Sequence, residues 1–185
     1  MKKMLMLFMT LLMCALVFAG CSSDGSDNGG GDPAEIKGEV YDAGNVSALV
    51  PEGWMAFPVS DMWSDDTDAT DPDQLQICKD AESEWDLLTK PMVDIVYYDA
   101  STSMMTPSAE WYDETEELEP MEIGGKTWNG FIGKSYDLPL AILWTGESDG
   151  DQFQVTIWLE TAEGSVSIDD ADVQAIIGSI QPSAN

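Results

Sequence analysis

Two apolar segments in the C-terminal half read Leu140-Ala141-Ile142-Leu143-Trp144 and Gln152-Phe153-Gln154-Val155-Thr156-Ile157-Trp158-Leu159-Glu160. The second alternates strictly between apolar and other residues, which is typical of a strand with one buried face. The first is apolar on both faces, which predicts a strand in the middle of a sheet covered on two sides. The residues between them, Gly146 to Asp151, are typical of a turn, so the two segments are expected to form an antiparallel hairpin.

The clearest predicted helix follows this hairpin. Val173, Ile176, Ile177 and Ile180 recur at helical spacing and form a single apolar stripe. Ser167 and Asp170 have the spacing of a capping box, and Pro182 is expected to end the helix.

Further elements are expected upstream of this pair and complete the fold class. Strands are predicted at 46–50, 75–78, 92–98 and 127–136, a tight turn at 123–127, and helices at 81–88 and 106–118. The second of these helices is expected to open at Thr106-Pro107 and to place Trp111, Thr115 and Leu118 on one side. The sum is an α+β domain, a mainly antiparallel β-sheet with helices packed on it.

The order of these elements resembles the PsbP-like superfamily. The resemblance covers most of residues 40–181, and its sharpest motif is the turn Val50-Pro51-Glu52-Gly53-Trp54, with the final helix from Val173 to Ile180 in support. It implies an α/β/α sandwich around an antiparallel sheet, and a family whose characterised members bind proteins and do not catalyse reactions. No catalytic residue can be carried over, because no active-site motif is present to match.

The first residues have the pattern of an export signal. Met1-Lys2-Lys3 precedes an apolar run from Met4 to Ala19, which is shorter than a membrane-spanning helix requires. Ala19-Gly20 then precedes Cys21, so the segment resembles the bacterial lipoprotein signal, although Phe18 stands where Leu is usual. Cleavage after residue 20 would make Cys21 the lipidated N-terminus; the alternative is an ordinary cleavage site with an incidental cysteine.

The sequence therefore predicts three parts: a signal peptide at 1–20, a flexible tether at 21–33 and a single domain at 34–185. The tether is rich in Gly, Ser and Asp and has no apolar residue beyond the cysteine, so it cannot bury surface. Lipid chains on Cys21 would anchor the domain at the extracytoplasmic face of a bacterial cell membrane.

Composition excludes several classes of function. The formal net charge is −28, from 35 acidic residues against 7 lysines, with no histidine and no arginine. Nucleic acid is excluded as a partner, because phosphate binding relies on Lys and Arg. Catalytic arrangements that need an imidazole are also excluded, as are bidentate arginine clamps.

One cysteine, Cys78, and one carboxylate, Asp94, remain to be weighed as catalytic groups. Cys78 stands in a predicted strand and is expected to be a buried small side chain, since no histidine can activate it. Asp94 lies within the apolar strand 92–98 and is the best candidate for a perturbed carboxyl, as a carboxylate-dependent hydrolase would need. The preferred alternative is that Asp94 points outward or meets Lys90.

The densest acidic segment is a candidate calcium site. Asp residues at alternating positions could offer several oxygens to Ca²⁺. Their spacing fails the EF-hand pattern, so a solvated loop is the preferred interpretation. The candidate ligands are Asp65, Asp66, Asp68, Asp71 and Asp73.

Trp63 and Trp158 are the aromatic candidates for ligand binding. Trp63 lies in the acidic segment and Trp158 on the polar side of its strand, while most of the seven tryptophans are expected in the core. Exposed aromatic rings beside carboxylates can stack on sugars or on a peptide. Burial of Trp158 by helices covering both sheet faces is the preferred alternative.

These observations favour a surface-tethered, non-catalytic binding or accessory lipoprotein with a protein or peptide partner. The alternative is a carbohydrate- or calcium-binding module, and a weaker one is the hydrolase. No cofactor is expected, with calcium as the one ion considered.

Overall fold

The computed structural model describes residues 36–102, 104–146 and 150–184. The signal peptide, the lipidation residue Cys21 and the tether, predicted at 1–20 and 21–33, lie outside the described residues. Among those described, no helix has the length and apolar character needed to cross a membrane.

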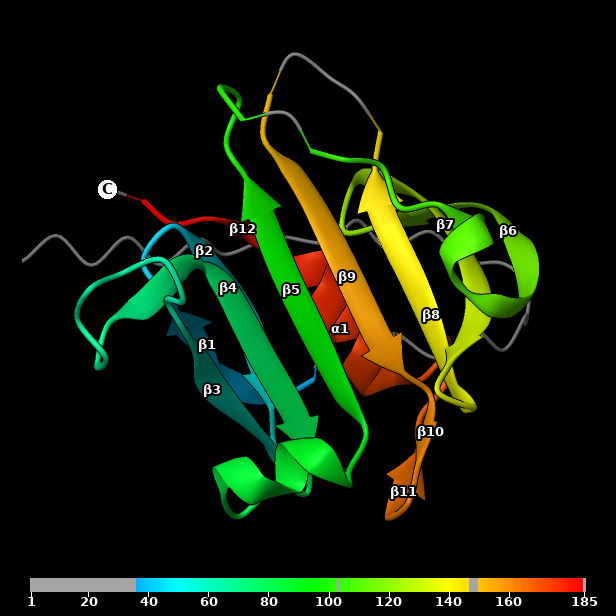
Figure 1. Cartoon of the computed structure of the whole chain (residues 1–185), viewed down its shortest axis with the longest axis horizontal. Coiled ribbons are helices and arrows are strands. Elements are labelled where there is room, and N and C mark those ends of the chain that lie inside the picture. The colour runs from blue at the N-terminus through cyan, green and yellow to red at the C-terminus, as the bar shows by residue number, and fades with distance from the viewer. Residues whose placement is uncertain (1–35, 103, 147–149, 185) are drawn as a thin grey trace, which may run out of the picture. The chain divides into compact units, whose positions relative to one another are not determined.

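A seven-stranded antiparallel sheet forms the body of the fold, in the order β3-β4-β5-β9-β8-β7-β6 (Figure 1). Its strands are β3 (Trp54–Ser60), β4 (Thr70–Lys79), β5 (Met92–Tyr98), β6 (Asp113–Ile123), β7 (Lys126–Ser135), β8 (Leu138–Thr145) and β9 (Gln152–Trp158). A smaller sheet, β1-β2-β12, comprises β1 (Gly38–Asp42), β2 (Val46–Pro51) and β12 (Gln181–Pro182), and β10 (Glu160–Thr161) pairs with β11 (Gly164–Ser165). The α+β class with a mainly antiparallel sheet is therefore confirmed.

The predicted hairpin at the centre of the sheet is confirmed. β8 and β9 pair antiparallel, with Leu140 opposite Trp158 and Trp144 opposite Gln154. The inward side chains of this pair, including Leu143, Val155 and Ile157, are fully buried. The strands predicted at 46–50, 75–78, 92–98 and 127–136 are also present, within one or two residues at the ends or as part of a longer strand.

One face of the large sheet is covered by α1 (Ala171–Ser179) and by β2. The predicted apolar stripe is confirmed, because Val173, Ile176, Ile177 and Ile180 are all fully buried against the sheet. The helix begins three residues later than a cap at Ser167 implies, since Asp170 is its N-cap residue. The Asp170 carboxylate nevertheless accepts a hydrogen bond from the Ser167 backbone N–H at 2.9 Å, which is one half of a capping box.

The helix predicted at 106–118 is wrong. A 3₁₀ turn, η2 (Ala109–Trp111), is followed by the edge strand β6, which pairs with β7 through the turn at Gly124-Gly125. The Glu-rich composition of this segment favours a helix locally, but pairing to β7 supplies backbone partners and buries Leu118, Met121 and Ile123 against the core. The helix predicted at 81–88 is a shorter 3₁₀ helix, η1 (Glu84–Leu88).

The opposite face of the large sheet carries no α-helix among the described residues. In Figure 1 this face is turned to the viewer and α1 lies behind the strands. Only the short turns η1 and η2 stand at its margins. The helices that the PsbP-like resemblance implies on this side are absent from the part of the chain that is described.

Candidate functional site

A single cross-strand row of side chains traverses the open face of the sheet. Residues directly opposite each other on paired antiparallel strands project to the same side, so the strand registers place these side chains on one face. The row, from β3 to β6, is Phe57, Gln76, Asp94, Thr156, Ile142, Phe131 and Glu117. Its centre is polar and half-buried, and it is flanked by buried apolar side chains on both sides.

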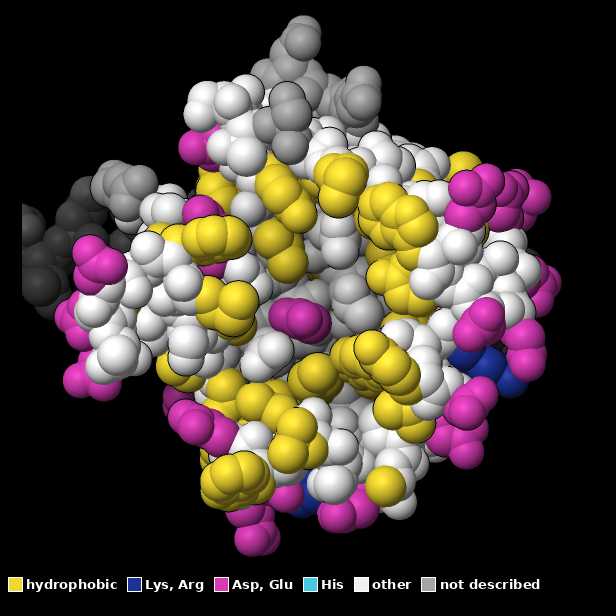
Figure 2. Space-filling model, in the orientation of Figure 1, with side chains coloured by type: hydrophobic (Ala, Val, Ile, Leu, Met, Phe, Trp, Pro, Cys, Tyr) yellow, Lys and Arg dark blue, Asp and Glu magenta, His cyan; other side chains and the backbone are white. Residues whose placement is uncertain are grey.

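Asp94 lies in the polar part of this row, between Gln76 and Thr156. Figure 2 looks onto the open face and shows an acidic side chain in a shallow hollow with apolar side chains around it. The strand registers independently place Asp94 on this face, where it lies between Gln76 of β4 and Thr156 of β9. A carboxyl in this position is surrounded by the side chains of Gln76, Thr156 and the apolar residues beside them.

The Asp94 carboxyl has too few partners for a buried charge. Its Oδ1 atom is inaccessible to solvent and has no hydrogen-bond partner. Burial raises the pKa of Asp94 to about 6, and the polar side chain of Gln76, opposite Asp94 on β4, opposes that rise. The expected contact with Lys90 does not form, because the Lys90 ammonium lies 3.4 Å from the Asp86 carboxylate and donates to the Asp80 carbonyl oxygen at 2.7 Å.

Two hollows adjoin the row. One of about 570 Å³ lies between η1 and the β3–β4 connection, and is lined by Phe57, Gln76, Met92 and Trp85. The other, of about 700 Å³, lies beside η2 and is lined by Phe131, Trp144, Asn129 and Glu117 among others. Both therefore include members of the cross-strand row.

The margins of the open face carry large apolar side chains exposed to solvent. Trp85 is 79% exposed and Leu88 76% exposed on η1, and Trp111 is 59% exposed on η2. Next to Trp111, Ala109 and Tyr112 pack on the buried Phe131, Leu140 and Ile142 of the open face. A rim of exposed aromatic and aliphatic groups around a half-buried floor is a feature of interaction surfaces.

The two predicted aromatic candidates are not brought together. Trp63 is 92% exposed in the β3–β4 connection. Trp158 is half-buried on the open face, where it packs beside Leu140 at the far end of β9. The registers place the β3–β4 connection at the Tyr98 end of β5 and Trp158 at the Met92 end, so the two rings do not form one strip.

The acidic segment is organised by its own backbone. The Asp66 carboxylate accepts the Asp68 N–H at 3.0 Å, Asp71 accepts the Asp73 N–H at 2.9 Å, and Asp73 accepts the Asn45 side-chain amide at 2.9 Å. Asp71 and Asp73 belong to strand β4, while Asp65 is exposed in the connection before it. In the described part of the chain, no three acidic or cysteine side chains converge as an ion would require.

Cys78 is fully buried on β4, two residues after Gln76. Burial raises the pKa of its thiol to about 11, so it is neutral near pH 7. The prediction of a small buried side chain is confirmed.

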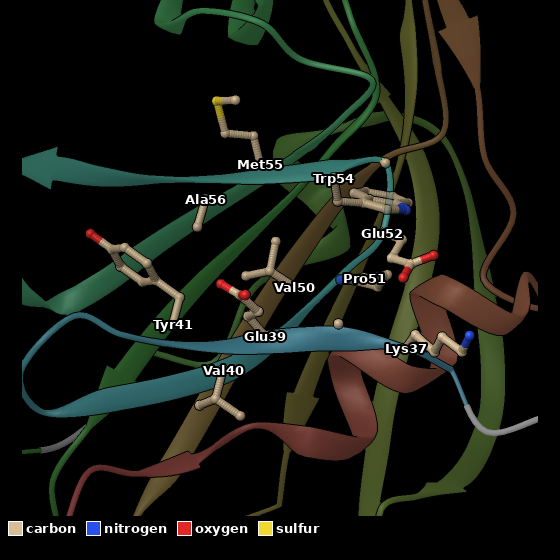
Figure 3. Close-up of a pocket in the computed structure, with 12 residues that line it drawn as sticks. Lys37, Glu39, Val40, Tyr41, Val50, Pro51, Glu52, Trp54, Met55 and Ala56 are labelled. Atoms are coloured by element: carbon tan, nitrogen blue, oxygen red, sulfur yellow. The ribbon is translucent and has the colours of Figure 1, made fainter.

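A separate hollow of about 550 Å³ lies between β1 and β3 (Figure 3). It exists because β2 pairs with β1 while β3 pairs with β4, so the chain passes from the small sheet to the large one at Glu52-Gly53. Figure 3 shows Tyr41, Val50 and Ala56 between the two strands. The hollow contains no buried polar group without a partner, so it lacks the chemical feature of the Asp94 site.

Sequence reasoning identified Asp94 but missed its neighbours. Gln76 on β4 and Thr156 on β9 stand directly opposite Asp94. The signal for them was the alternation of polar residues in these two strands, Gln74 and Gln76 in β4 and Gln152, Gln154 and Thr156 in β9. These residues could be recognised as neighbours of Asp94 only once the strand order was known. β5 pairs with both β4 and β9, and β9 lies far along the chain.

Comparison with known proteins gives little further information. No protein-family model matches the chain, and no curated protein matches it. A solved structure of a protein from Bacteroides thetaiotaomicron VPI-5482 aligns with a TM-score of 0.42 and 10% identity. That alignment covers 80% of this chain and 50% of the other, so this chain spans about half the length of that protein.

Proposed function

We propose that this protein is a surface-tethered, non-catalytic binding lipoprotein whose open sheet face receives a protein or peptide partner. The observation that carries the proposal is the uncovered face of the large sheet, with its half-buried row and exposed apolar rim. A sheet face that is not covered by a helix exposes groups that folding normally buries, and a partner would supply the missing cover.

The extent of the face favours a polypeptide over a small molecule. The row crosses all seven strands, and hollows of about 570 and 700 Å³ lie toward its two ends. Side chains of a partner could occupy both hollows at once, with the main chain lying over Asp94 between them. The exposed Trp85 and Trp111 are of the residue type that most often carries binding energy at protein interfaces.

Catalysis is not part of the proposal. A hydrolase of the two-carboxylate kind needs a second acid within about 10 Å of the first. Within the described residues, the open-face neighbours of Asp94 on adjacent strands are Gln76 and Thr156, and the next carboxylate of the row, Glu117, stands four strands away. A lone carboxyl with an amide and a hydroxyl beside it favours binding.

The PsbP-like relationship is retained as part of the proposal. It is supported by the Pro51–Trp54 turn, by the antiparallel hairpins and by the closing helix. The anchoring at an extracytoplasmic membrane face is supported by the signal-like segment and Cys21. Calcium or sugar binding is not proposed, because no described group of residues favours either ligand.

Site-specific photo-crosslinking in the native cell envelope tests the proposed surface. A photoreactive residue at Trp85 or Trp111, both exposed at the rim, is expected to crosslink a discrete polypeptide. The matched control carries the same group at Val40, which is 66% exposed on β1 and away from the open face. Equal crosslinking from Val40 and from the rim positions, or none from the rim, would reject the open face as the binding surface.

A further inference from the structure

The open face has one feature that a merely apolar interface does not explain: a carboxyl group at its centre. An ionised carboxylate in such a position costs free energy unless a cation or several donors meet it. Gln76 lies opposite Asp94 on β4, and the Oδ1 atom of Asp94 has no hydrogen-bond partner. A leucine or valine at this position would pack the floor without that cost.

The chain places no cation of its own beside Asp94 among the described residues. Lys90 is held by Asp86 and by the Asp80 carbonyl, and Lys134 by Glu114. Lys126 donates to the Ile180 carbonyl at 2.7 Å. Lys79 is opposite Trp54, on the face that α1 covers. Lys37 lines the separate hollow between β1 and β3. The chain has neither histidine nor arginine, so none of the described residues supplies the missing positive charge.

We propose that Asp94 is the anchor for a lysine side chain of the partner polypeptide, flanked in the partner by apolar residues that enter the two adjoining hollows. This inference rests on the proposed function and adds the chemistry of the partner's central residue. Charge complementarity supports it, because a chain with a formal net charge of −28 attracts basic segments and repels acidic ones.

The hydrogen-bond acceptors around Asp94 favour lysine over arginine as the partner's residue. A guanidinium binds best when both oxygens of a carboxylate are available to its two parallel N–H groups. Here the Oδ1 atom of the Asp94 carboxyl is inaccessible to solvent, so a fork cannot reach both oxygens. An ammonium group is a compact donor of three hydrogen bonds, which the Asp94 carboxylate, the Thr156 hydroxyl and the side-chain oxygen of Gln76 or Gln154 can accept from one face.

The positions of Phe57 and Ile142 in the row explain why the partner's lysine should stand between apolar residues. Phe57 lies two strands to one side of Asp94, and Ile142 lies two strands to the other. Both are buried in the floor, and the hollows beyond them are lined by Trp85 and by Trp144. The aliphatic stem of a lysine would therefore lie against apolar side chains while its ammonium reaches the carboxylate.

Selection from a display library of short random peptides tests the inference with the full chain held in detergent micelles. Wild-type protein is expected to enrich peptides with a lysine between apolar residues. Replacing that lysine by norleucine in a synthetic copy should weaken binding about ten- to a hundredfold, as for a hydrogen bond to a charged group. The Asp94→Asn variant should bind the lysine and norleucine peptides alike, whereas Glu39→Gln, at an exposed carboxylate on β1, should behave as wild type.

The outcomes separate the inference from the proposed function. Peptides that lose binding when Trp85 is replaced by Ser, but show no lysine preference, would overturn the Asp94 anchor and leave the open face as the binding surface. Failure to enrich any peptide sensitive to Trp85 would overturn both. Binding of n-butylammonium that depends on Asp94, without any selected peptide, would assign the site to a small amine and reject the polypeptide partner. Because asparagine has nearly the shape of aspartate, the Asp94→Asn variant is expected to fold, and Thr156→Val provides a second variant of the same site.

Discussion

Gly124 lies against Gly178, and the two residues set how closely the β6–β7 turn approaches helix α1. A Cβ atom built on Gly124 would be 2.1 Å from the Gly178 carbonyl oxygen and 2.5 Å from its Cα atom. No side chain fits at that distance without moving the helix or the turn. The contact joins the turn of the β6–β7 hairpin to helix α1, which covers the core. It therefore links two parts of the fold that are distant in sequence.

Gly124→Ala is expected to lower the free energy of unfolding by about 3 kcal/mol or more, since it adds a steric clash to the cost of a left-handed backbone at φ +60°. Gly125→Ala is the matched control, because Gly125 has φ +74° but nothing within 4 Å of the added Cβ. That variant should lose only about 1 kcal/mol, the cost of the left-handed conformation for a residue with a side chain. Urea denaturation of both variants measures the difference. Equal losses would mean that the contact between the glycines yields easily.

Trp54 connects the start of β3 to the first turn of α1. Its indole N–H donates to Asp172 Oδ2 at 3.2 Å, and the ring is buried. Asp172→Ala should destabilise the fold by about 1 to 2 kcal/mol, because it removes this bond and an acid at the helix N-terminus. Asp169→Ala, at an exposed neighbouring acid, is the control. In a double-mutant cycle with Trp54→Phe we expect a coupling of about 1 kcal/mol, and a coupling near zero would show that the bond contributes nothing.

Local patterns predicted most of the fold. The alternation of Gln152 to Glu160 and the stripe from Val173 to Ile180 identified β9 and α1, because both elements bury one regular face. The prediction failed at 106–118, where the local preference of a Glu-rich segment for helix was outweighed by pairing to β7. That pairing depends on the hairpin at Gly124, beyond the segment itself, so its own residues could not indicate it.

The candidate site was only partly predictable, for a related reason. Asp94 was recognisable as a polar residue within an apolar strand. Its burial depends on β4 and β9, which flank β5 in the sheet although β9 follows much later in the chain. The same strand order separates Trp63 from Trp158, the two aromatic candidates for ligand binding. Sequence periodicity assigns a residue to a face, but the neighbours across that face come from the topology.

Cys21→Ser is expected to move the protein from the membrane fraction to the soluble exported fraction when it is expressed in a bacterium. The reason is the loss of acyl chains, each buried methylene of which contributes about 0.8 kcal/mol to membrane binding. Ser23→Ala, two residues further on, is the control and should stay with the membrane. Fractionation followed by mass spectrometry of the N-terminus checks both points, and a Cys21→Ser variant that stays in the membrane fraction would reject the lipid anchor.

Asp94→Asn is expected to stabilise the fold at neutral pH, at the expense of binding. The folded-state pKa of Asp94 is raised from 3.8 to about 6, so the native protein holds the proton more tightly than the unfolded chain does. The resulting stability is fully present below about pH 4 and is lost as the pH rises through 6. The wild type should therefore be about 2 to 3 kcal/mol less stable than the variant at pH 7.5.

Urea denaturation of both proteins at pH 4 and at pH 7.5 measures this difference. The gap between variant and wild type should be small at pH 4 and should open as the carboxyl ionises. Glu39→Gln, at an exposed carboxylate, reports the general effect of removing one negative charge from a strongly acidic chain. If Asp94→Asn is no more stable than wild type at pH 7.5, the carboxylate already has adequate partners in the free protein. Asp94 would then need no external cation.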